Sequence, residues 1–123
     1  DGPCTLITGD VAFLYDINGL WSDNFPKNLL IIVMNNNGGE IFNLIDGPDK
    51  IPESLPYQVT PHQRSIEKVA SQFGLDYLCA ENFGELHKCL DQMSDYSKPF
   101  ILEVKTNPED NKAFYQRFKN NTL

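Results

Sequence analysis

The sequence has little of what nucleic-acid-binding and membrane proteins need. Only 10 of its 123 residues are Lys or Arg, against 17 Asp or Glu, so the formal net charge is -7 at pH 7. Clustered cations are required to neutralise backbone phosphates, and this balance therefore argues against a nucleic-acid partner. No apolar stretch approaches the roughly 18 residues of a membrane-spanning helix, and no signal-peptide pattern is present. We therefore expect a soluble, cytoplasmic protein.

Cysteine is also scarce. The three cysteines are odd in number and too irregularly spaced for a zinc ribbon or a Cys-x-x-Cys redox pair. Cys79 lies in an apolar run and Cys89 lies beside the apolar face of an expected helix, so both are expected in the core. Cys4 is expected to be exposed, with no implied function. The histidines, His62 and His87, have no nearby partner in the sequence, and neither is assigned a catalytic role.

Short apolar runs alternate with stretches of helical periodicity, which predicts an α/β fold with a doubly wound parallel sheet. The expected strands span residues 5–8, 29–34, 77–80 and 100–104. The run 29–34 shows no polar alternation, as is typical of a strand covered on both faces. We expect a truncated sheet of about four strands, with helices on both faces.

The expected helices follow from apolar stripes and stop signals. A helix over 11–17 would connect the first two strands in a right-handed βαβ unit. One later stripe comprises Ile66, Val69, Ala70 and Phe73, before Gly74. Another, in a helix capped by Asn82, comprises Phe83, Leu86, Leu90 and Met93. A terminal helix after Pro108 has apolar positions that include Ala113, Phe114 and Phe118.

Two polar signals follow the first two strands: Gly9-Asp10 and the Asn-Asn-Asn-Gly-Gly run at 35–39. Neighbouring parallel strands lie about 4.8 Å apart, so both signals would meet at the carboxyl edge of the sheet, where α/β folds bind ligands. Carboxylate, amide and main-chain oxygens suit Mg²⁺. Gly38 and Gly39 would allow close backbone approach and positive φ. A short helix from Glu40 would direct free N–H groups at a diphosphate.

This arrangement resembles the thiamine-diphosphate-dependent enzymes, in which a Gly-Asp pair and later paired asparagines bind the metal. Asp10 and Asn36 are 26 positions apart. The resemblance implies that Asp10, the side chain of Asn36 and the carbonyl of Gly38 bind Mg²⁺, with Mn²⁺ as the alternative. The common pattern has a second glycine after the aspartate, whereas this chain has Val11.

That departure points to one branch, the menaquinone-pathway 2-succinyl-5-enolpyruvyl-6-hydroxy-3-cyclohexene-1-carboxylate synthases. Their sequences resemble this chain over residues 9–20, 35–42 and 60–62. The last stretch leads into an expected helix that ends at residues 72–74. The implied cofactor-binding residues are Gly9, Asp10, Val11, Asn36, Gly38, Gly39, Glu40, Ile41 and Phe42. The implied substrate-binding residues are Ile41, Phe42 and Ile45.

The resemblance implies a complete enzyme that uses thiamine diphosphate to decarboxylate 2-oxoglutarate and add the product carbanion to isochorismate. Because 123 residues make only one domain, 1–123 is expected to be its carboxyl-terminal cofactor domain, incomplete at its N-terminus. The family's cofactor-activating glutamate lies on another domain, so no catalytic residue is assigned and the isolated chain is expected to be inactive. The complete enzyme is expected to be a homodimer or homotetramer, and exposed sheet edges would favour self-association of the chain.

Other interpretations remain at this stage. Individually, Asp10 suits a helix N-cap and the Asn-Gly run suits a turn. An acetolactate-synthase-like carboligase is a second enzyme candidate, although the run 16–20 argues against it. A flavodoxin-like Mg²⁺ or phosphate-binding domain would use Asp10 and Lys105 but lacks an acidic pair after the first strand. The proline-rich segment 46–61 is expected to be a long loop, and Phe42 and Ile45 could equally serve only to pack the short helix.

Overall fold

Four parallel strands form the sheet that organises the molecule. The computed structural model describes residues 4–22, 24, 26–93 and 98–122. The strands are β1 (Cys4–Gly9), β2 (Leu29–Asn35), β3 (Asp76–Ala80) and β4 (Phe100–Lys105). They pair in the order β1-β2-β4-β3, and all pairs are parallel. The four predicted strands and the parallel α/β class are therefore confirmed, with each strand slightly longer than expected.

Helices connect the strands. The α-helices are α1 (Asp10–Tyr15), α2 (Leu55–Val59), α3 (Ile66–Gln72), α4 (Phe83–Gln92) and α5 (Pro108–Thr122). Short 3-10 helices are η1 (Ile17–Trp21), η2 (Glu40–Asn43) and η3 (Pro48–Lys50). The expected helix over 11–17 is thus an α-helix followed by a 3-10 turn. No helix in the described part of the chain is long and apolar enough to cross a membrane.

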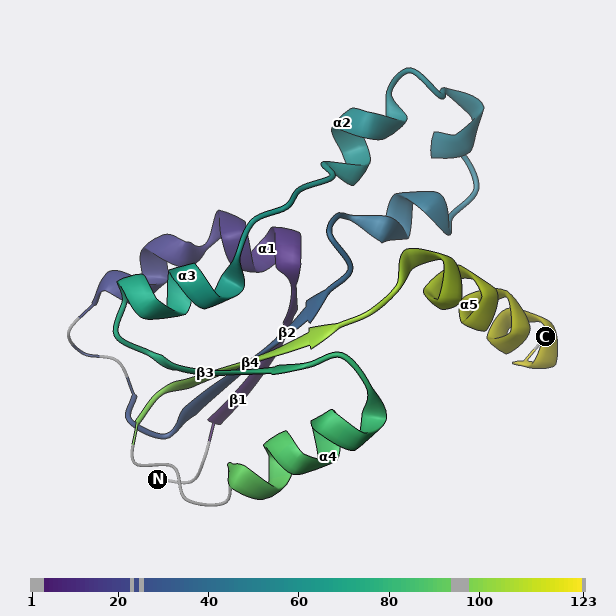
Figure 1. Cartoon of the computed structure of the whole chain (residues 1–123). Helices are drawn as coiled ribbons and strands as arrows, with labels where there is room; N and C mark the ends of the chain where they lie inside the picture. The colour runs from purple at the N-terminus through teal and green to yellow at the C-terminus, as the bar shows by residue number, and fades with distance from the viewer. Residues whose placement is uncertain (1–3, 23, 25, 94–97, 123) are drawn as a thin grey trace.

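The segment 46–61 is more ordered than predicted, because it contains η3 and α2 rather than only an irregular loop. A proline lies in the first two positions of each helix, where a missing backbone N–H costs nothing. The prolines therefore begin helices here instead of preventing them. Figure 1 shows η2, η3 and α2 as an extension beyond the carboxyl end of β2.

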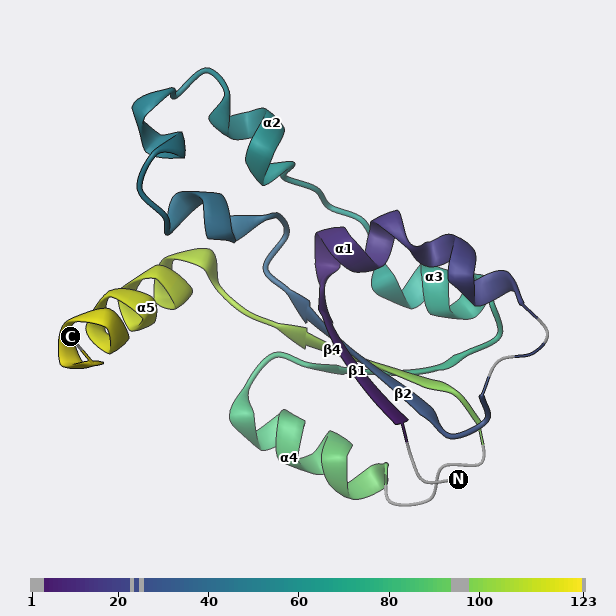
Figure 2. The same cartoon turned by 180° about the vertical axis from the view of Figure 1, so that it is seen from behind.

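Helices cover both faces of the sheet, as predicted. Figures 1 and 2 show α1 and α3 on one face and α4 on the other, while α5 projects away from the sheet. The core follows the strand alternation: Ile31 and Val33 pack with α1 and α3, whereas Leu30 packs with α4. The carboxyl ends of β1 and β2 emerge beside the start of α1, which positions the candidate site.

Parts of the predicted apolar stripes are wrong. Phe83 and Leu90 are 82% and 44% exposed, whereas Met93, just after α4, and Cys89 are buried against the sheet as expected, and Leu86 packs beside them. Phe83 begins the helix, where the chain still lies beyond the packed surface. In α5, Phe114 and Phe118 are exposed because this helix does not cover the sheet.

The three cysteines have different surroundings. Cys89 is buried, as expected, and its thiol donates to the carbonyl of Cys79 at 3.7 Å. Cys79 itself is half-buried, and Cys4 is exposed as predicted.

Candidate metal and cofactor site

The register of the sheet joins the two polar signals. Gly9 in β1 pairs with Met34 in β2, so both strands end at the same level. Asp10 begins α1 and is 2% exposed. Its Oδ1 accepts the Val11 N–H at 2.8 Å, and its Oδ2 accepts the Gly38 N–H at 2.9 Å. The carboxylate therefore connects the start of α1 with the turn that follows β2.

That turn, residues 35–39, is called the asparagine turn below. Asn35 begins it by accepting the Asn37 N–H through Oδ1 at 2.9 Å. Asn37 has the left-handed φ of 65°, whereas neither Gly38 nor Gly39 has a left-handed φ. The expected use of positive φ at the glycines is therefore wrong, because asparagine tolerates that conformation.

Close approach explains the glycines instead. A Cβ at Gly38 would lie 3.0 Å from the carbonyl oxygen of Val59, at the end of α2. The same carbonyl accepts the Gly39 N–H at 2.6 Å. The asparagine turn is thus pressed against the end of α2, and side chains at these positions would separate them.

A cleft of about 470 Å³ opens beside Asp10 and the asparagine turn. It is lined by most of the residues predicted for the cofactor, namely Gly9, Asp10, Val11, Asn36, Gly38, Gly39, Glu40 and Ile41. Phe42 is not among its lining residues and lies near Gly39. Ile45, predicted to contact substrate, is exposed and also outside the lining.

The short helix expected at Glu40 forms as η2, a 3-10 helix of four residues. Glu40 is held by Asn43, whose Nδ2 donates to its Oε2 at 2.7 Å. A single 3-10 turn aligns few peptide dipoles. Ligand binding in the cleft therefore depends on its side chains and backbone oxygens rather than on the dipole of η2.

The donor atoms at the cleft fit a hard divalent cation. Asn36 Oδ1 is buried and has no hydrogen-bond partner within the described part of the chain. Each oxygen of Asp10 accepts one N–H and keeps a further lone pair. Over the described residues there is no cluster of three or more His, Cys, Asp or Glu that could enclose a metal alone. Such a set suits Mg²⁺ or Mn²⁺ carried by a phosphate, which supplies the remaining oxygens with water.

His62 lies at the site, although no role was assigned to it from the sequence, where residues 60–62 were only part of the family resemblance. Its side chain is 9% exposed, and Nε2 lies 3.2 Å from Asp10 Oδ2. This is a close contact rather than an aligned hydrogen bond. His62 Nδ1 accepts the Arg64 N–H, and the His62 N–H donates to the carbonyl of Asn37. In the neutral ring the hydrogen is therefore on Nε2, which is directed at Asp10.

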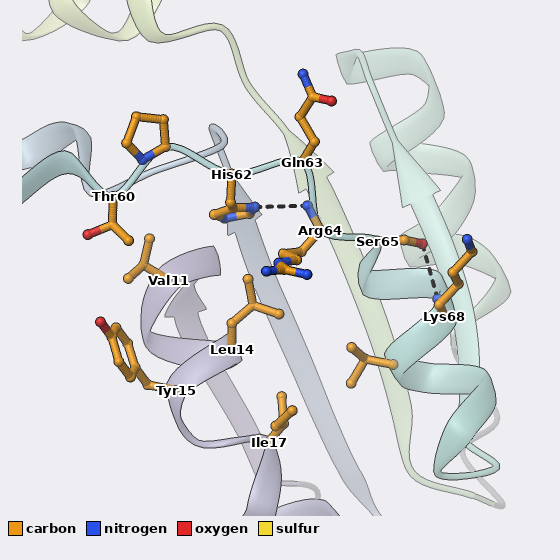
Figure 3. A pocket seen from close by; sticks show the side chains of 12 residues that line it. Val11, Leu14, Tyr15, Ile17, Thr60, His62, Gln63, Arg64, Ser65 and Lys68 are labelled. Atoms are coloured by element: carbon orange, nitrogen blue, oxygen red, sulfur yellow. Dashed lines mark hydrogen bonds between the residues drawn. The ribbon is translucent and has the colours of Figure 1, made fainter. Parts of the chain in front are cut away.

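A larger pocket of about 750 Å³ adjoins the cleft, and Val11 and Tyr15 line both. Figure 3 shows its apolar wall from α1 and its polar wall from the segment before α3. Arg64 and Lys68 lie on the polar side, so this adjoining pocket carries cationic side chains.

A buried carboxylate lies behind the asparagine turn. Glu103 of β4 is 3% exposed and accepts two hydrogen bonds, from Asn35 Nδ2 at 2.6 Å and from the Tyr77 hydroxyl. Burial, aided by the contact with Glu103, raises the pKa of Tyr77 above its usual range. Burial also raises the pKa of the neighbouring Cys79 thiol. Tyr77 and Cys79 therefore stay protonated at neutral pH.

Comparison with solved structures defines the class of domain. The chain superimposes with a TM-score of 0.73 on benzoylformate decarboxylase from Polynucleobacter necessarius, at 18% identity, covering 86% of this chain and 20% of that one. The thiamine-diphosphate-dependent 4-hydroxybenzoylformate decarboxylase of Rhodococcus jostii RHA1 gives 0.70 at 23% identity, covering 87% and 20%. At these identities the likeness establishes the fold alone, which this chain shares with about a fifth of each of these two decarboxylases. No family model matches the chain.

Sequence relatives define the family. The 2-succinyl-5-enolpyruvyl-6-hydroxy-3-cyclohexene-1-carboxylate synthase of Cytophaga hutchinsonii is 39% identical over 118 residues, which is 94% of this chain and 21% of the relative. The synthase of Chlorobaculum tepidum is 36% identical over 95% of this chain and 20% of its own length. The chain belongs to this synthase family, and it spans about a fifth of the length of these relatives.

Proposed function

We propose that this chain is the diphosphate-binding and metal-binding part of a synthase that requires thiamine diphosphate and Mg²⁺, with Mn²⁺ as a substitute. The complete enzyme would decarboxylate 2-oxoglutarate and join the product to isochorismate in menaquinone biosynthesis. The observation that carries the proposal is the buried Oδ1 of Asn36, which has no hydrogen-bond partner among the residues that the structure describes, in the cleft that also holds the Asp10 carboxylate. The identity to the synthases, higher than to the structurally similar decarboxylases, favours this branch over an acetolactate-synthase-like carboligase.

In this proposal the chain binds and orients. Asp10, Asn36 Oδ1 and the carbonyl of Gly38 hold the cation, and the cation neutralises the diphosphate in a chain of net charge -7. Gly9, without a side chain, leaves the cleft open beside Asp10, and Ile41 supplies an apolar wall. Thiamine diphosphate, when bound, supplies the nucleophilic carbon for decarboxylation and carbon–carbon bond formation.

The chain would not complete a catalytic cycle alone. In the resembling enzymes the glutamate that activates the cofactor belongs to another domain, and Glu40 is held by Asn43 at the edge of the cleft. Turnover by the purified 123-residue chain, above a metal-free blank, would contradict this part of the proposal.

Calorimetric titration with thiamine diphosphate, with and without Mg²⁺, tests the site. Asp10→Asn keeps the shape of the side chain and removes its charge, while Asp16→Asn makes the same change at an exposed position after α1. We expect Mg²⁺-dependent binding in the parent chain and in Asp16→Asn, and at least about tenfold weaker binding in Asp10→Asn.

Equal affinity in the parent chain and Asp10→Asn would refute the metal assignment. If the 123-residue chain alone binds nothing, the titration is repeated on a longer protein that contains it together with the other domains of the family. Absence of Mg²⁺-dependent binding there would refute the proposed function.

A further inference from the structure

We propose that Glu103 is a positioning residue that, through the amide of Asn35, orients the asparagine turn and so the oxygens of Asn36 and Gly38. The inference rests on the proposed function in one respect, namely that the turn holds the cation. It adds a buried carboxylate of β4 and a defined amide orientation to the site.

The position of Glu103 calls for a reason. It lies in an inner strand, between β2 and β3, on the sheet face where Val33 and Ile101 form the apolar core. A carboxylate is costly to bury unless hydrogen bonds compensate it. Both of its oxygens are engaged, one by Asn35 Nδ2 and the other by the Tyr77 hydroxyl. One oxygen of the carboxylate is thus held in position to accept a hydrogen bond from Asn35.

The direction of the hydrogen bonds determines how the Asn35 amide is oriented. The backbone N–H of Asn37 can only donate, so Asn35 Oδ1 must face it. The NH₂ group of Asn35 then faces Glu103, which can accept it. With an apolar side chain at position 103, the NH₂ group of Asn35 would lose its acceptor, and the Asn37 N–H would be the only one of these two contacts left to hold the amide.

The orientation matters because the candidate ligands lie on the turn that it anchors. Asn36 follows Asn35 directly, and its buried Oδ1 has no hydrogen-bond partner among the residues described. At the other end of the turn, the Gly38 N–H is held by Asp10. Glu103 and Asp10 therefore hold the two ends of the segment that carries the candidate ligand oxygens.

Four variants separate positioning from general stability. Glu103→Met removes the acceptor at nearly the same volume. Asn35→Asp keeps the acceptor for Asn37 but places two carboxylates together. The double variant Asn35→Asp/Glu103→Gln restores the hydrogen bond with its direction reversed, because the amide NH₂ group at position 103 can donate to the carboxylate at position 35. Glu103→Gln alone can still turn its oxygen to Asn35 and is the conservative control.

Tyr77→Phe is the matched control for the other side of Glu103. It removes the second hydrogen bond to the carboxylate without changing the asparagine turn. If Glu103 served only the stability of the fold, Tyr77→Phe and Glu103→Met could differ in unfolding free energy, but neither would change Asn37 exchange selectively.

Two readouts are measured on all variants. Amide hydrogen exchange of Asn37, followed by nuclear magnetic resonance, reports the turn without any ligand. Calorimetry with thiamine diphosphate and Mg²⁺ reports the cation site, in whichever protein the parent sequence binds. We expect faster Asn37 exchange and roughly 10–100-fold weaker binding in Glu103→Met and Asn35→Asp. The double variant, Glu103→Gln and Tyr77→Phe should approach the parent protein.

The inference would be overturned if the double variant does not recover the Asn37 exchange rate and the cofactor affinity that Asn35→Asp loses. The same holds if the double variant does not fold. Parent-like Asn37 exchange in Glu103→Met would also overturn it. If the parent protein itself binds no cofactor, the proposed function fails, while Asn37 exchange still decides whether Glu103 orients the turn.

Discussion

Gly38→Ala tests the close approach between the asparagine turn and α2. The added Cβ would lie 3.0 Å from the Val59 carbonyl oxygen and 3.1 Å from its Cγ1. The first contact is with backbone, which cannot move aside as a flexible side chain can. The Val59 carbonyl also accepts the Gly39 N–H, so any shift that relieves the crowding lengthens that hydrogen bond.

The expected cost follows from these contacts. Overpacking of this kind costs about 1–3 kcal/mol, and the strained hydrogen bond adds up to about 1 kcal/mol. Replacing glycine restricts the unfolded chain and returns about 0.4–1 kcal/mol. The net loss of unfolding free energy is therefore between about 0 and 3.6 kcal/mol, with a central value of about 2 kcal/mol, and each kcal/mol lowers Tm by roughly 4 °C in a domain of this size.

Thermal unfolding and cofactor calorimetry measure this effect together. Gly19→Ala is the control, because a Cβ there meets no heavy atom within 4 Å among the described residues. We expect Gly38→Ala to unfold at a lower temperature and to bind Mg²⁺ and thiamine diphosphate more weakly, and Gly19→Ala to match the parent. A Gly38→Ala chain as stable as Gly19→Ala would refute the close-packing argument.

Three further predictions concern other parts of the fold. His62→Asn keeps an acceptor for the Arg64 N–H but removes the Nε2 contact with Asp10, so Mg²⁺-dependent cofactor binding should weaken about tenfold; unchanged calorimetric affinity would contradict it. The raised pKa of Tyr77 means that the folded state holds the phenolic proton more tightly than the unfolded state, so stability should fall as pH rises above about 10. Tyr77→Phe should reduce the loss of Tm with rising pH. An unchanged dependence of Tm on pH would count against the raised pKa of Tyr77 as its cause. In denaturant unfolding, Met93→Ala should lower the unfolding free energy by about 2–5 kcal/mol, because Met93 is 4% exposed. Phe83→Ala should change it by less than about 0.5 kcal/mol, because Phe83 is 82% exposed. Similar losses in the two variants would disprove the packing of α4.

The sheet was the most predictable part of the molecule. Runs such as 29–34 are apolar without interruption, which is typical of a strand covered on both faces, and most of this strand is at least half-buried. The meeting of Asp10 with the asparagine turn followed from the parallel pairing of β1 and β2. Local pattern and topology were sufficient here, because both signals come directly after strands that lie side by side.

Contacts across the chain could not be predicted in the same way. His62 lies 52 positions from Asp10 in sequence. A single histidine does not indicate by itself that the segment after α2 returns to contact Asp10. The roles of Val59 beside Gly38 and of Glu103 beneath Asn35 depend on packing between distant elements. The apolar pattern of α4 was correct at Leu86 and Met93 and wrong at Phe83 and Leu90, because burial depends on which part of the helix packs against the sheet.

The hydrogen bond from the Gly38 N–H to Asp10 also bears on the chemical ageing of the chain. Asparagine before glycine deamidates readily, because the glycine nitrogen can attack the asparagine side-chain carbonyl without steric hindrance. In the folded chain that nitrogen is held 2.9 Å from Asp10 Oδ2, and Asn37 is fixed at φ 65°. Deamidation of Asn37 is therefore coupled to opening of the turn. Loss of the Asp10 carboxylate would speed the conversion of a neutral amide into a carboxylate within the asparagine turn.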